Sequence, residues 1–304
     1  MDRNTFTGLF LIMIVLAGSF YFFKPSEAEI KKEQERIAAD SIKKTSSNTN
    51  TAQAPAAAAP AAPILDSAAL QGPFGANISG TVQNSVLENE QLKLTVTNKG
   101  GKILSVEVKD YKTYEGKPVI LFDGSQNKFG LNLNIGGKLV STNDLYFTAT
   151  KSGSSISMRA NYAGDKYIEF MYSLKPNSNK VDFNINLNGM NQVIQTNTLA
   201  LNWEATLLEQ EKSGKKEQEH SAPYYKYVNE NPDHLSITKD EKEELKEGKI
   251  EWISFKQHFF SAVLIPAVPF EQGDLEVKVS TKPGEVKWYG ANMQVAFNQL
   301  ASQS

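Results

Sequence analysis

The side chains that could perform acid–base or metal chemistry are few and widely separated in this sequence. The three histidines, His220, His234 and His258, are not at the spacing of zinc ligands, and none has a nucleophile as a neighbour. The chain has no cysteine, which excludes disulfides, thiolate metal sites and cysteine catalysis. It also lacks a glycine-rich phosphate loop and a G-x-S-x-G nucleophile elbow. We therefore predict no catalytic residue, no metal and no cofactor.

Charged and aromatic residues give no clearer indication of chemistry. The carboxylates lie mainly in two polar runs, residues 209–219 and 240–247, and such runs usually form a solvated surface rather than an acid–base pair. The net charge is −2, and the lysines near residue 215 are interleaved with acids, so nucleic acid is not an expected partner. Trp203, Trp252 and Trp288 could stack on a sugar, although core packing is the alternative.

Alternating apolar and polar residues predict the elements that position these side chains. The alternation is typical of half-buried antiparallel strands. It recurs in six segments, residues 92–96, 104–108, 168–174, 181–187, 199–203 and 275–279. Between residues 131–135 and 138–140, Gly136-Gly137 suits a tight hairpin because glycine accepts positive φ. Many short strands with frequent turns predict a mainly β sandwich or barrel.

Two helices are predicted beside the strands. Thr238-Lys239-Asp240-Glu241 has the form of a capping box, and the polar run after it stops at Gly248, so a short surface helix is expected there. Near the end of the chain, the apolar residues of segment 293–300 lie at helical spacing. This second helix could pack on the sandwich or lie at a membrane surface.

The longest apolar stretch lies at the beginning of the chain. Residues 5–23 carry no charge, and a helix of that length spans roughly 28 Å, which is close to the thickness of a bilayer core. We predict a transmembrane anchor within residues 1–24. The residues assigned to the anchor are Phe6, Leu9, Phe10, Leu11, Ile12, Ile14, Val15 and Leu16. A cleaved signal peptide is the alternative, since Ala17-Gly18-Ser19 offers small residues, but the apolar run extends beyond the usual length.

A polar linker is predicted between the anchor and the β domain, over residues 25–79. Its first part, residues 27–44, is rich in Glu, Lys, Gln and Ala and could form a short polar helix. Residues 45–63 are rich in Ala, Pro, Ser and Thr, bury almost nothing and are expected to be a disordered tether. Lysines after the anchor favour a cytoplasmic location for the large domain by the positive-inside rule.

Residues 252–266, WISFKQHFFSAVLIP, carry a family resemblance. This apolar segment resembles a W-hydrophobic-x-Q-x-Y/F-F-x-x-hydrophobic-I-P pattern in the YidC family of bacterial membrane protein insertases. The matching residues are Trp252, Gln257, Phe259, Phe260, Ile265 and Pro266. Three further stretches agree in order and spacing. They are the N-terminal MDRN before the apolar span, Gly100 and Gly101 with Tyr111 after them, and Trp288-Tyr289-Gly290, where Ala291 stands in place of the usual proline.

The resemblance, which is to Gram-negative and Bacteroidetes-like members, implies a fold and a location. The fold would be a β-supersandwich similar to galactose mutarotases over residues 80–304, with a C-terminal connecting helix. The motif residues would hold its core and join it to the membrane part rather than contact substrate. The domain would be periplasmic and the N-terminus cytoplasmic, opposite to the local charge count, because large domains translocate largely regardless of charge. Family members continue into five further membrane helices that form the insertase core. This core is expected to be missing from the present chain, which ends at Ser304.

The resemblance also implies a function without enzyme activity. The chain would assist insertion and folding of inner-membrane proteins, alone or with the Sec translocon. The implied partners are the lipid bilayer, nascent membrane proteins through the absent core, the Sec translocon and its SecDF accessory proteins. Two other hypotheses remain. One is a membrane-tethered carbohydrate-binding or mutarotase-like protein, which needs a cleft with convergent carboxylate and histidine groups. The other is a periplasmic scaffold without an insertase part.

Overall fold

The computed structural model describes residues 72–124 and 126–297, which form a mainly β domain. Every pair of neighbouring strands in it is antiparallel, as in the hydrogen-bonded ladder of β1 and β2. The prediction of a mainly β fold is therefore confirmed. The predicted anchor and the greater part of the predicted linker lie outside the described residues. Within those residues, no helix has both the length and the apolar character needed to cross a bilayer.

Four sheets make up the domain. The β1–β4 sheet contains, in spatial order, β1 (Asn84–Glu88), β2 (Leu92–Thr97), β3 (Lys102–Lys112) and β4 (Pro118–Asp123). The β7–β10 sheet contains β10 (Val181–Asn188), β9 (Lys166–Leu174), β8 (Ser155–Ala163) and β7 (Thr148–Ser152). The six-stranded sheet contains β14 (Glu241–Leu245), β17 (Gln272–Val279), β18 (Glu285–Ala296), β11 (Thr198–Leu208), β5 (Lys128–Ile135) and β6 (Lys138–Ser141). The β12–β16 sheet contains β13 (Asp233–His234), β12 (Ala222–Tyr227), β15 (Ile250–Lys256) and β16 (Ser261–Leu264).

Short helical segments connect some of these strands. They are η1 (Gly75–Asn77), η2 (Thr142–Asp144), η3 (Met190–Gln192) and α4 (Gly214–Glu219). Phe74, just before η1, is completely buried, with its ring 5.3 Å from that of Tyr162. The packed domain thus begins before residue 80, where the sequence placed its boundary.

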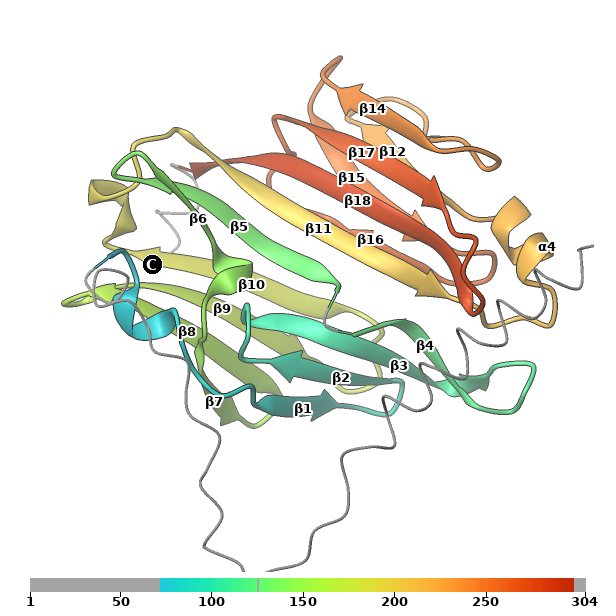
Figure 1. Cartoon of the computed structure of the whole chain (residues 1–304), viewed down its shortest axis with the longest axis horizontal. Helices are drawn as coiled ribbons and strands as arrows, with labels where there is room; N and C mark the ends of the chain where they lie inside the picture. The colour runs from blue at the N-terminus through green and yellow to red at the C-terminus, as the bar shows by residue number, and fades with distance from the viewer. Residues whose placement is uncertain (1–71, 125, 298–304) are drawn as a thin grey trace, which may run out of the picture. The chain divides into compact units, whose positions relative to one another are not determined.

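One face of the six-stranded sheet contacts two other sheets. Phe129 of β5 lies 5.1 Å, between ring centroids, from Phe183 of β10. Trp203 of β11 pairs with Phe129 across the ladder and stacks on Phe255 of β15 at 3.8 Å. Figure 1 shows β17, β18, β11 and β5 side by side in the six-stranded sheet. β10 and β16 are terminal strands of their sheets, and residues of both strands line one groove.

All six segments with alternating patterns form strands, namely β2, β3, β9, β10, β11 and β17. In β9, Ile168, Phe170, Tyr172 and Leu174 are all buried, and β11 alternates buried and half-buried side chains along its whole length. The Gly136-Gly137 hairpin is confirmed, since both glycines have positive φ, 58° and 76°, between β5 and β6. Here the side-chain period of two and the local turn residues were sufficient to define the element.

The predicted helix at residues 238–248 is wrong, because Glu241–Leu245 forms strand β14. The residues of the apparent capping box bind elsewhere: Asp240 Oδ1 accepts from the Val279 amide at 2.8 Å, and Glu241 accepts from the Ser236 amide. β14 pairs with β17 and buries Leu245 completely. The predicted C-terminal helix is also wrong as far as Ala296, since Met293 and Ala296 belong to β18, and residues 298–304 lie outside the described part.

Candidate functional site

A groove of about 1860 Å³ is bordered by the edge strands β10 and β16. Phe183 and Ile185 of β10 and Leu264 of β16 line it, and Phe129 and Trp203 contribute from the six-stranded sheet. Small-molecule sites typically occupy about 300–1,000 Å³. The groove is therefore larger than a typical site for one small metabolite.

The hairpin of β15 and β16 is built from residues 252–266, the segment with the family resemblance. Its Phe255 is 1% exposed and packs between Trp203 and Tyr289, with ring centroids 3.8 and 5.3 Å away. Phe259 at the turn and Ile265 after β16 are instead 71% and 62% exposed. Of this segment, Phe255 therefore lies in the packed core, whereas Phe259 and Ile265 lie at the surface of the domain.

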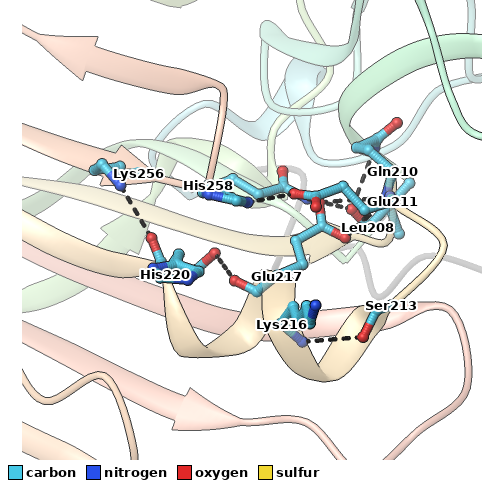
Figure 2. A network of polar contacts seen from close by, with 11 residues as sticks. Leu208, Gln210, Glu211, Ser213, Lys216, Glu217, His220, Lys256 and His258 are labelled. Carbon is cyan, nitrogen blue, oxygen red and sulfur yellow. Dashed lines mark hydrogen bonds and ion pairs between the residues drawn. The ribbon is translucent and has the colours of Figure 1, made fainter.

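A buried polar network fixes this hairpin to the rest of the domain (Figure 2). Glu217 of α4 is 1% exposed and accepts hydrogen bonds from the amides of Gln210 and Glu211 and from Gln257 Nε2, the last at 2.6 Å. Gln257 Nε2 also donates to the Leu208 carbonyl at 2.5 Å. Burial raises the pKa of the Glu217 carboxyl, which these donors partly offset. Gln257 thus connects the hairpin turn to the end of β11 and to α4.

Beside this network lies a histidine pair. His258 Nδ1 is 2.7 Å from Glu211 Oε1, and the rings of His220 and His258 stack with centroids 4.4 Å apart. The ring of Phe259 also stacks on His258, with ring centroids 4.0 Å apart. Within the described residues, no group of three or more potential ligands is placed to hold a metal. His258 thus links Glu211 to the turn that carries Phe259.

Sequence reasoning missed this cluster. It treated residues 209–219 as a solvated face, but Glu217 is buried and α4 begins at Gly214, with the amide of Lys216 donating to Ser213 Oγ at 3.4 Å. The partners come from segments about forty residues apart, as in the Gln257–Glu217 bond. No local spacing relates them, so only the packing of β15 against β11 brings them together.

Residues 288–290 join the same region. Tyr289 is completely buried, and its hydroxyl donates to the Lys256 carbonyl at 3.0 Å. A Cβ on Gly290 would lie 2.4 Å from the Trp288 ring, so glycine allows that ring to fold over the backbone. Gly100 and Gly101 lie elsewhere, in the β2–β3 turn, with φ of 83° and 62°. Among the motif residues, those of the hairpin and residues 288–290 therefore lie together in the structure. Gly100 and Gly101 lie apart from them.

A buried lysine lies next to α4. Lys287 of β18 is completely buried, and its Nζ donates to the carbonyls of Ser221 and Ile237 at 2.5 and 2.8 Å. Burial lowers the pKa of Lys287 to about 8, because the charged form loses hydration. No carboxylate among the described residues forms an ion pair with it. The sequence offered no signal for this residue, which joins β18 to the segments after α4 and after β13.

Comparisons with known proteins agree with the motif reading. Residues 84–304 match a family model described as the YidC periplasmic domain. The chain is 35% identical over its whole length to a membrane protein insertase YidC of Phocaeicola vulgatus, and 32% identical to one of Bacteroides fragilis, covering 49% of each relative. A relative in Parabacteroides distasonis is 31% identical over 98% of this chain and 49% of its own length. The chain spans about half the length of the curated relatives it matches.

Two solved structures align with this chain at low identity and low TM-score. A galactose mutarotase-like protein from Lactobacillus casei aligns with 70% of this chain and 87% of its own, at 10% identity and a TM-score of 0.38. An aldose epimerase homologue from C. elegans aligns with 70% of this chain and 90% of its own, at 11% identity and a TM-score of 0.34.

Proposed function

Because this chain belongs to the YidC family, as its motifs predicted, we propose that it forms the periplasmic part of an insertase that assists insertion and folding of inner-membrane proteins. The observation that carries the proposal is the match of residues 84–304 to the periplasmic-domain model, together with 35% identity over the whole chain. In this proposal the domain has no catalytic role. It acts as an interaction platform, alone or together with the Sec translocon and SecDF.

The groove and the β15–β16 hairpin are the proposed platform. Two hydrogen bonds hold the hairpin in place. Gln257 donates to the buried Glu217, and the Tyr289 hydroxyl donates to the Lys256 carbonyl. Apolar side chains such as Phe183 and Leu264 face the groove and remain accessible to a partner. A surface that is fixed before binding loses little conformational freedom on association, which favours recognition.

The proposed topology places the N-terminus in the cytoplasm, the anchor in the inner membrane and the β domain in the periplasm. It can be tested with single cysteines, since the chain has none of its own. With Ser47→Cys, we expect a membrane-impermeant maleimide added to intact spheroplasts to label the chain. Labelling that occurs only after the inner membrane is broken would overturn the orientation.

The insertase function is tested with the complete gene. We expect its reading frame to continue past Ser304 into five further apolar spans, and its expression to restore insertion of a reporter membrane protein in cells depleted of their own insertase. Protease protection of the reporter measures insertion directly. A frame that stops at Ser304, or restored expression without restored insertion, would refute the assignment.

A carbohydrate-binding function is the second candidate, and one observation favours it. Glu211 lines the groove and lies 2.7 Å from His258, which brings a carboxylate and a histidine together beside the opening. Mutarotation, however, needs an acid and a base on two different sugar oxygens, whereas here the two groups bind each other. Titration with galactose or glucose, followed by tryptophan fluorescence, should show no saturable change; a saturable change lost in Glu211→Gln would favour this candidate.

A further inference from the structure

Exposed apolar side chains gather around the groove. Of the twelve large hydrophobic residues that are exposed in the described part, six line this one opening. We call these six the rim patch: Tyr111, Tyr114, Phe259, Val263, Ile265 and Val268. Single exposed hydrophobic residues are ordinary on protein surfaces, but such clustering marks a contact surface.

The rim patch is held in its exposed position. Phe259 stacks on His258, which is fixed by Glu211, and Phe260 packs edge-on against Tyr111 with ring centroids 5.3 Å apart. Gln257 ties the same turn to the buried carboxylate of Glu217. The turn therefore cannot fold Phe259 back into the core without breaking these contacts, and the apolar tip is presented in advance of any partner.

The charge around the opening is positive. The three carboxylates that line the groove each have a cationic or histidine partner within 3.1 Å, in the pairs Asp182–Lys175, Glu204–Lys128 and Glu211–His258. Lys112, Lys180 and Lys212 also line it, and none of them forms an ion pair with a carboxylate of the described residues. A partner that complements this face must offer negative charge beside apolar surface.

We propose that this face docks on a lipid bilayer that contains anionic lipid. The rim patch enters the boundary between head groups and acyl chains, and Lys112, Lys180 and Lys212 contact lipid phosphates. Proteins bind membrane surfaces with aromatic and aliphatic side chains beside lysines. An anionic bilayer matches this combination, because it offers both an apolar interior and negatively charged head groups. A protein partner would need an apolar surface and matching carboxylates.

The bilayer is within reach if the domain works at a membrane, so this inference rests on the proposed function. The predicted span ends at Phe23, and 48 residues separate it from Gly72, the first described residue. A flexible chain of that length has an end-to-end distance of about 40 Å, which is comparable to the dimensions of a small domain. With the anchor and tether that the sequence predicts, the face would be at a high local concentration near the lipid surface.

The test uses single cysteines in the otherwise cysteine-free full chain, reconstituted in liposomes. Phe259→Cys and Ile265→Cys place an environment-sensitive NBD label in the rim patch. Leu139→Cys is the matched control, since Leu139 is 77% exposed and does not line the groove. In vesicles containing phosphatidylglycerol, we expect blue-shifted emission at positions 259 and 265 and quenching by nitroxide-labelled lipids several-fold stronger than at 139. Replacing Lys112, Lys180 and Lys212 by Gln, or using phosphatidylcholine alone, should reduce both effects.

Three results would contradict the inference, and they can be told apart. If the chain floats with the liposomes but the labels at 259 and 265 behave like the label at 139, the face does not dock. Blue-shifted labels that nitroxide lipids do not quench would show that protein covers the patch instead of lipid. A chain that fails to float with the liposomes lacks a membrane anchor, which would overturn the proposed function and this inference with it.

Discussion

Lys287 gives the sharpest test of the energetics of this fold. Its ammonium is completely buried and has two carbonyl acceptors, of Ser221 and Ile237, but no described carboxylate partner. Burial lowers its pKa from the ordinary 10.5 to about 8. Below pH 8 both the folded and the unfolded chain hold the proton, so the full cost of burying the charge is present. Between pH 8 and 10.5 the folded chain loses the proton first, and the free energy of unfolding rises with pH.

The size of the effect follows from the change in pKa. A fall from 10.5 to about 8 corresponds to roughly 3 kcal/mol at about 1.4 kcal/mol per pH unit, of which about 2 kcal/mol is recovered between pH 7 and 9.5. The two carbonyl acceptors stabilise the charged form, so we expect about 1 kcal/mol. In Lys287→Met this rise should be absent. At pH 7 the variant removes a buried charge but leaves two carbonyls without a donor, and these effects oppose each other.

The measurement is urea unfolding of the chain in mild detergent, followed by the fluorescence of its three tryptophans, at pH 7.0, 8.0, 9.0 and 9.5. The quantity of interest is the free energy of unfolding of the wild-type chain minus that of Lys287→Met at each pH. Lys138→Met, at an exposed hairpin position, is the control and should retain the wild-type dependence. The series stops at pH 9.5 because burial raises the pKa of Tyr172 and Tyr289, and ionisation of unfolded tyrosines would then reverse the slope. A difference between wild type and Lys287→Met that stays constant with pH would refute the reasoning.

Three further predictions concern the hairpin and its support. Gln257→Leu should lower the free energy of unfolding by about 2–3 kcal/mol, because it leaves the buried Glu217 carboxylate without its side-chain donor; an unchanged urea midpoint would show that the network is not stabilising. Phe255→Ala should cost about 3–5 kcal/mol, whereas Phe259→Ala should change stability by less than about 0.5 kcal/mol, since the two side chains are 1% and 71% exposed; equal losses in thermal melts would contradict the burial. Gly290→Ala should cost about 1–3 kcal/mol and shift Trp288 emission, because the new Cβ meets the indole ring at 2.4 Å. Gly248→Ala, whose Cβ would meet Tyr227 at an ordinary 3.6 Å, should be nearly neutral.

The sequence predicts those parts of the fold that depend on neighbouring residues. β9 and β11 follow from alternation alone, because each places one face on a core, and the β5–β6 hairpin follows from two glycines at positive φ. β14 could not be predicted in this way. Its residues form an apparent capping box, but pairing with β17 and burial of Leu245 outweigh the local preference for helix.

The candidate site was only partly predictable for a similar reason. The resemblance selected Gln257 and Tyr289 as motif residues without relating their positions, and the structure brings both to the hairpin. It did not separate the buried Phe255 from the exposed Phe259, since both are aromatic and four residues apart. Glu217 and Lys287 are charged residues whose burial depends entirely on distant partners, and no pattern along the chain encodes that.

The position of β18 has a mechanical consequence. This strand lies inside the six-stranded sheet, paired with β11 from Glu285 to Ala296 and with β17 from Lys287 to Gln294, and it leads directly to the last described residue, Phe297. A pull on the chain beyond Phe297 is directed along the strand. It loads both ladders in shear, so many hydrogen bonds must fail together, whereas an edge strand pulled sideways would unzip one bond at a time. The last described residue is thus joined to the domain through a strand that is held by hydrogen bonds on both sides.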